Sequence, residues 1–152
     1  MARITDIAAE IKTIIDALTV AGGYNYNWST FNETDLALNN TFPLANIRYN
    51  SDTAADGIAG YYGFSNAEFT ITIEQTITPS ATVKPEFTAD AALDKGLADL
   101  QKAFRQNTLG YFPLTGQSFF SYKSSEKIAN TRGSTYRPVK LVTKWNCFYN
   151  SL

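Results

Sequence analysis

The chain lacks the side chain that proteins use most often for acid–base chemistry. Its 152 residues include no histidine and a single cysteine, Cys147. Histidine is the commonest general base and metal ligand, so one copy cannot build a Ser-His-Asp or Cys-His arrangement or a nitrogen–sulfur zinc site. A single cysteine also excludes an intrachain disulfide. Cys147 occupies an apolar position of a predicted strand, where we expect a buried thiol that packs as a small hydrophobe.

Carboxylates are the remaining groups that could act as acid and base. Asp90 and Asp94 are four residues apart in a predicted helix, and Glu68 and Glu74 share one face of a predicted strand. We interpret both pairs as ordinary solvated faces, because these spacings recur on any exposed helix or strand. Residues 57–63 are rich in glycine but lack the Lys-Ser/Thr ending of a phosphate loop, and the calcium-loop pattern is absent. We therefore expect no enzyme activity, no cofactor and no metal.

The charge is distributed unevenly along the chain, although the formal net charge is only −1. Residues 1–76 hold three bases against nine acids, whereas residues 77–152 hold ten bases against five acids. A basic C-terminal third can bind nucleic acid, particularly where aromatic residues are interleaved with the bases. Opposite-signed halves can also pair between copies of one protein, and a solvated basic edge is the third interpretation.

Two segments have helical periodicity. In residues 4–20, apolar residues recur every three or four positions, and the Gly22-Gly23 pair is expected to end the helix. Residues 89–106 carry a leucine stripe, and Thr88 is expected to cap that helix. Gly96 costs about 1 kcal/mol against alanine inside a helix. A close crossing over a sheet would explain its presence.

Alternating apolar and polar residues predict the strands, which cover residues 24–28, 45–49, 66–78, 118–124 and a last stretch beginning near Pro138. Residues 50–65 are expected to form a long loop, and residues 117–149 an extended hairpin. This order predicts one α+β domain over residues 1–152. Its sheet is expected to be mostly antiparallel, with two main helices packed on one face and long loops at the edges.

The sequence also carries expectations about location. The N-terminal residues contain no long apolar run, so we expect no signal peptide. No stretch approaches the roughly 20 apolar residues of a membrane helix, so we expect no membrane association. The lone cysteine agrees with a reducing compartment.

The order of the elements resembles that of the tail-terminator proteins of long-tailed bacteriophages. The similarity lies in the isoleucine-rich opening helix, the strand led by Pro43, the alternating strand at residues 69–73, and the two closing segments at residues 91–104 and 137–145. These are framework patterns and include no catalytic motif.

The resemblance implies a structural virion protein that forms a homohexameric ring on the head-proximal end of the tail tube. Such a ring stops tube polymerisation and joins the tube to the head connector, and DNA only passes through its lumen. The implied location is the virion, after synthesis in the host bacterial cytoplasm. Two alternatives stay open: a neck or head-completion protein of the same virion, and a nucleic-acid-binding module that uses the basic C-terminal third.

A ring of identical subunits needs a head-to-tail contact between two different surfaces of the chain. We expect the long loop and the basic closing segment to supply these surfaces. The hypothesis is that Arg132, Arg137, Lys140 and Lys144 of one subunit meet acids such as Asp52, Asp56 or Glu33 of the next. The full set of predicted interface residues is Asp52, Asp56, Tyr61, Tyr62, Lys123, Lys127, Arg132, Arg137, Lys140 and Lys144.

Overall fold

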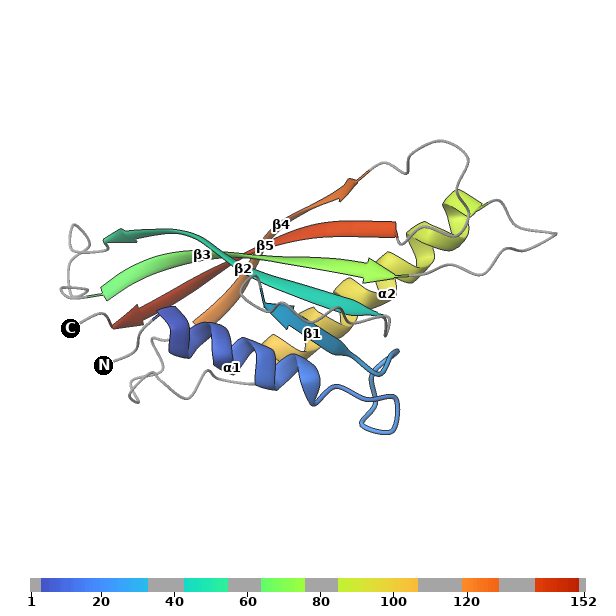
Figure 1. Ribbon diagram of the computed structural model, residues 1–152, viewed down its shortest axis with the longest axis horizontal. Coiled ribbons are helices and arrows are strands. Elements are labelled where there is room, and N and C mark those ends of the chain that lie inside the picture. The colour runs from blue at the N-terminus through green and yellow to red at the C-terminus, as the bar shows by residue number, and fades with distance from the viewer. Residues whose placement is uncertain are drawn as a thin grey trace.

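A five-stranded sheet and two helices make up the part of the chain that the computed structural model describes, which is residues 4–32, 43–54, 64–75, 85–106, 119–128 and 139–150 (Figure 1). The fold is therefore α+β. Along the chain the elements are α1 (Ile4–Asp16), β1 (Ser29–Asn32), β2 (Leu44–Ala54), β3 (Phe64–Gln75), α2 (Pro85–Gln106), β4 (Phe119–Ile128) and β5 (Val139–Asn150).

The sheet is mixed, which corrects the expectation of a mostly antiparallel one. Its strand order is β1-β2-β3-β5-β4, and β1 pairs parallel with β2, whereas the other three pairings are antiparallel. The parallel pair arises because the segment predicted as the first strand, residues 24–28, is not a strand. The strand begins later, at Ser29, and runs beside β2 from Leu44 onward.

A buried carboxylate explains why residues 24–28 form a loop. Asp99 of α2 is 2% exposed and accepts hydrogen bonds from the backbone N–H groups of Asn25 at 2.9 Å and Tyr26 at 3.2 Å. It also accepts one from the indole N–H of Trp28 at 2.9 Å. The backbone N–H groups of Asn25 and Tyr26 therefore bind Asp99 and do not pair with a neighbouring strand. The aromatic residues at these positions alternate because they pack onto α2, and this packing leaves the same sequence pattern as a strand would.

Both helices differ from their predicted bounds. The first ends at Asp16, and residues 19–24 form a separate turn in which the N–H groups of Gly22 and Tyr24 bind the carbonyl oxygen of Thr19. Gly23 has a φ of 95° and so adopts the left-handed conformation that favours glycine, but it belongs to this turn and does not end the helix. The second helix starts four residues early, at Pro85, because proline is well tolerated in a first helical turn.

Strands β2, β3 and β4 extend into segments predicted to be irregular. The second strand continues to Ala54 and the third begins at Phe64, so both ends of the predicted loop over residues 50–65 are strand. Residues 55–63 lie outside the described residues. Strands β4 and β5 pair antiparallel from Phe119 with Phe148 to Ile128 with Lys140, as the two arms of the predicted hairpin would.

One hydrophobic core contains buried side chains from both helices and from the sheet. α1 contacts β1 and β2, while α2 contacts β3, β4 and β5. Gly96 lies where α2 crosses the sheet: a Cβ atom there would stand 3.3 Å from Ile73 and 3.4 Å from the indole of Trp28, so the expected close crossing is present. We call the sheet face in this core the inner face. Its buried side chains include Ala45, Ile47, Phe69, Ile71, Ile73, Leu141, Trp145 and Cys147.

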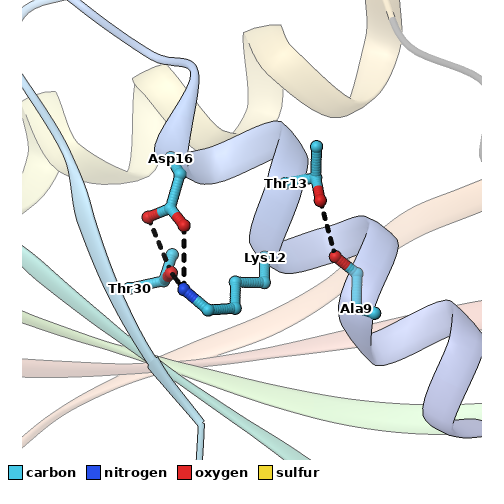
Figure 2. A network of polar contacts seen from close by, with 5 residues as sticks. All are labelled: Ala9, Lys12, Thr13, Asp16 and Thr30. Carbon is cyan, nitrogen blue, oxygen red and sulfur yellow. Dashed lines mark hydrogen bonds and ion pairs between the residues drawn. The ribbon is translucent and has the colours of Figure 1, made fainter. Parts of the chain in front are cut away.

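A polar network attaches the short edge strand β1 to α1 (Figure 2). The ammonium group of Lys12 donates to a carboxylate oxygen of Asp16 and to the hydroxyl of Thr30, each at 2.9 Å. The hydroxyl of Thr30 donates in turn to the other carboxylate oxygen of Asp16 at 2.7 Å. Since Thr30 is buried, this network holds the middle of β1 beneath the end of the helix.

Replacing Asp99 with asparagine should destabilise the fold strongly. The Asp99→Asn side chain keeps the shape but directs an NH₂ group at donors that need an acceptor, so we expect a loss of about 3 kcal/mol in the free energy of unfolding. Urea denaturation measures it. The matched control is Asp94→Asn, an exposed aspartate of the same helix, which should change stability by less than about 0.5 kcal/mol. Equal effects of the two variants would contradict a special role for Asp99.

Candidate functional site

The sheet face opposite the core, here called the outer face, is the surface with the most polar chemistry in the described structure. Its residues alternate with those of the inner face and are mostly half-buried or exposed. No residue of a described helix lines the open concavity on this face. The central strands contribute Asn46, Arg48, Glu68, Thr70, Thr72, Glu74, Lys140, Val142, Lys144 and Asn146 to it.

The extra residues of two β-bulges both bind the same acid, Glu68. In β2 the pairing register shifts between Tyr49 and Ser51, and in β4 it shifts between Tyr122 and Ser124. The bulge residue Asn50 donates its amide N–H to Glu68 at 3.0 Å, and the bulge residue Lys123 forms an ion pair with the other carboxylate oxygen at 2.7 Å. A single carboxylate on β3 therefore binds the neighbouring strand β2 and, across β5, the edge strand β4.

These contacts stabilise the ionised form of Glu68. The hydrogen bond from Lys123, and next the one from Asn50, hold the pKa of this carboxyl below its usual range. The amide of Asn50 also donates to the hydroxyl of Thr70 at 2.5 Å. The polar run at residues 50–53 belongs to β2 because residues 51–53 pair with β3 and the Asn50 side chain binds Glu68 and Thr70.

An open concavity of about 560 Å³ lies on the outer face beside this tie. Its described lining includes the two cations Arg48 and Lys144 and no carboxylate; the polar residues Asn46, Asn50, Thr70 and Thr72 complete its floor. The buried Oδ1 atom of Asn46 has no hydrogen-bond donor within the described part of the chain. A buried acceptor without a donor is uncommon in folded proteins, so a group that docks here would gain by supplying one.

Most of the predicted interface lysines that the structure describes already bind acids of the same chain. Lys123 binds Glu68, Lys127 binds Asp90 of α2, and Lys140 lies 3.3 Å from Glu74. Lys144 is exposed and lines the concavity. The acidic front half and the basic back half thus meet inside one subunit at two of these pairs, Lys123 with Glu68 and Lys140 with Glu74.

Asp52 lies apart from the outer face. The hydroxyl of Tyr149 donates to its carboxylate at 2.5 Å, and the register places Asp52 opposite the buried Ala67 on the inner face. Burial, followed by Asp52, raises the pKa of Tyr149 above its usual range, and burial raises the pKa of Cys147 to about 12. The predicted burial of Cys147 is confirmed. An intersubunit ion pair at Asp52 would have to share the carboxylate with Tyr149.

Half of the predicted interface set is not described structurally. Asp56, Tyr61, Tyr62, Arg132 and Arg137 lie outside the described residues, so their role stays a prediction. Sequence reasoning missed three residues of the outer face: Arg48, Asn50 and Glu68. The available signal for Asn50 was a polar residue where the alternation of the strand breaks, which is where bulges occur.

Other kinds of site were sought in the described residues. They contain no group of three or more His, Cys, Asp or Glu side chains arranged to hold a metal ion. None of the described helices is long and apolar enough to cross a membrane. The paired carboxylates Asp90 and Asp94 sit on the exposed surface of α2, and the first of them is engaged by Lys127. The outer face is therefore the candidate functional site.

Neutralising Glu68 should weaken the fold in a pH-dependent way. An unfolded glutamate has a pKa of about 4.3, and the folded value is lower, so the contribution of Glu68 is complete above the unfolded pKa and is lost as the pH falls through the folded pKa. At neutral pH, Glu68→Gln should lose about 1–2 kcal/mol of unfolding free energy. This difference from the unmodified protein should shrink as the pH is lowered from about 6 to about 3.

The matched control is Glu74→Gln, on the same strand and face, whose partner among the described residues is Lys140. Its partly exposed ion pair should contribute no more than about 0.5 kcal/mol. Urea titrations of both variants across this pH range provide the measurement. A Glu68→Gln curve that stays parallel to that of the unmodified protein would contradict the role given to Glu68.

Comparison with known proteins supplies no further assignment. No protein-family model matches this chain, and no curated protein matches it. A function for the chain therefore depends on the outer face, on the charges placed there, and on the resemblance in element order described above.

Proposed function

We propose that this chain is a structural assembly protein whose copies associate through the sheet, and that it is the tail terminator of a bacteriophage. In this role a ring of subunits caps the tail tube, stops its polymerisation and joins it to the head connector. The observation that carries the proposal is the outer face: its concave centre is polar and charged, no described helix lines it, and cross-strand contacts fix its shape.

The arrangement of the helices supports a protein with one surface reserved for assembly. We infer that α1 and α2 both pack on the inner face, since their buried side chains belong to the same core cluster. Within the described residues no helix lines the concavity on the other side, which leaves that side available to a partner, and interfaces between separately folded subunits are about as polar as the rest of a protein surface. The isoleucine-rich first helix and the two closing elements also keep the order that prompted the resemblance.

The partners follow from this role. They are other copies of the chain, arranged as a homohexamer, together with the tail-tube protein and the head connector or neck protein. DNA would only pass through the lumen, and the protein would reside in the virion at the head-proximal end of the tail. A neck or head-completion protein of the same virion would use the same kind of surface and differs in the partner bound.

A nucleic-acid-binding role is less well supported. The basic C-terminal third appeared suited to DNA, but Lys123, Lys127 and Lys140 each bind a carboxylate of the same chain. The outer face also carries Glu68 and Glu74, which would repel phosphates. Binding through counterion release requires cations that are available to phosphates, and these three pairs reduce that number.

The mass of the purified protein in solution tests the proposal. We expect light scattering to give about 100 kDa, as for six chains of 16.8 kDa, and negative-stain micrographs to show closed rings. A titration with duplex DNA at several salt concentrations is the companion measurement, and we expect little affinity. A chain that stays monomeric at every soluble concentration and binds DNA with a steep salt dependence would contradict the proposal.

A further inference from the structure

We propose that the concavity on the outer face receives the acidic side of α1 from a second copy of this chain. This inference rests on the proposed ring and names the two surfaces that meet in it. Three features support it: two cations on the sheet, two carboxylates on the helix, and a buried acceptor that has no donor among the described residues.

The two cations lie in one cross-strand row. Arg48 of β2 and Lys144 of β5 both pair with Thr70 of β3, one on each side. Neighbouring strands lie about 4.8 Å apart, so the two backbones are about 10 Å apart and their long side chains flank the concavity. Both side chains are exposed. This row therefore presents two positive groups on either side of a polar floor.

The same chain carries a matching pair of acids. Asp6 and Glu10 are four residues apart on α1, so they lie on the same side of the helix about one turn apart, within roughly 6 Å of each other. Asp6 is exposed and Glu10 is half-buried, and the described residues provide no ion pair for either. The neighbouring Lys12 and Asp16 bind each other and so do not neutralise them.

The location of the two surfaces suits a ring. The isoleucines of α1 enter the core on the inner face, whereas Arg48 and Lys144 lie on the outer face. A contact from the helix side of one subunit to the sheet side of the next is heterologous, and repeated contacts of this kind generate a closed ring when the rotation between subunits closes. The docked copy could also supply a donor for the Oδ1 atom of Asn46.

DNA fits this face less well than a second copy does. A phosphate backbone would meet Glu68 and Glu74 a few residues along β3, and it offers no donor to Asn46. The acidic side of a helix brings two carboxylates to Arg48 and Lys144, whereas a phosphate backbone brings a continuous row of charges that extends past them to those glutamates.

The test is a charge exchange followed by light scattering. Variant A carries Arg48→Glu and Lys144→Glu, and variant B carries Asp6→Lys and Glu10→Lys. Each alone brings like charges together, so we expect each to fall from the mass of the unmodified oligomer to that of the monomer. Mixed in equal amounts, A and B should regain the original mass. The acidic helix of A then meets the basic face of B, and the basic helix of B meets the acidic face of A. Recovery also shows that both variants are folded.

The control carries Asp94→Lys and Lys95→Glu, two exposed positions of α2 outside both surfaces. We expect it to assemble as the unmodified protein does. If A and B also assemble normally, the proposed contact is wrong and the ring uses another surface. Failure of the mixture to recover, or loss of DNA affinity in A with assembly intact, would also overturn it. If the unmodified protein is itself monomeric, the contact proposed here is wrong, and the proposed function fails too only where DNA binding with a steep salt dependence accompanies the monomer.

Discussion

A buried carboxylate needs nearby hydrogen-bond donors, and the donors that bind Asp99 determine much of this fold. They come from the loop between α1 and β1, so one side chain of α2 fixes how the N-terminal third of the chain lies on the rest. The bond to Trp28 places its indole beside Gly96, where the absence of a side chain allows α2 to approach the sheet. The loop then delivers β1 to the edge, parallel to β2, which makes the sheet mixed.

Periodicity predicted the elements whose neighbours are apolar. Both helices, β3 and β5 were anticipated because one of their faces enters the core. The errors have a common physical cause: at residues 24–28, at Asn50 and at Lys123, the backbone depends on a polar side chain that is distant in sequence. Asp99 lies more than seventy residues from Asn25, and no local pattern contains such a partner. The early start of α2 has another cause. Pro85 was interpreted as part of a connector, whereas it is the first residue of the helix.

The candidate site was predicted less completely than the fold. The charge asymmetry suggested ion pairs between acids of the first half and bases of the second half in different copies, but the sheet brings two such pairs together within one subunit. Lys123 reaches Glu68 across β5, a contact that exists only once β4 has bulged. Lys144 was in the predicted set and lies on the face that we consider functional, whereas Arg48 became relevant only when the strand pairing placed it beside Thr70.

The two bulges have a consequence for how this sequence can change over time. Each bulge reverses the correspondence between odd or even position and sheet face in the residues beyond it. Deleting Asn50 would therefore give a regular ladder in which Asp52 keeps its place opposite Ala67, while Glu68 would lose one of its two partners. Both bulge residues bind Glu68. Asn50, Glu68 and Lys123 should therefore be inherited as a set. A related chain that has lost one of them should have lost the others, or should carry strands of different length.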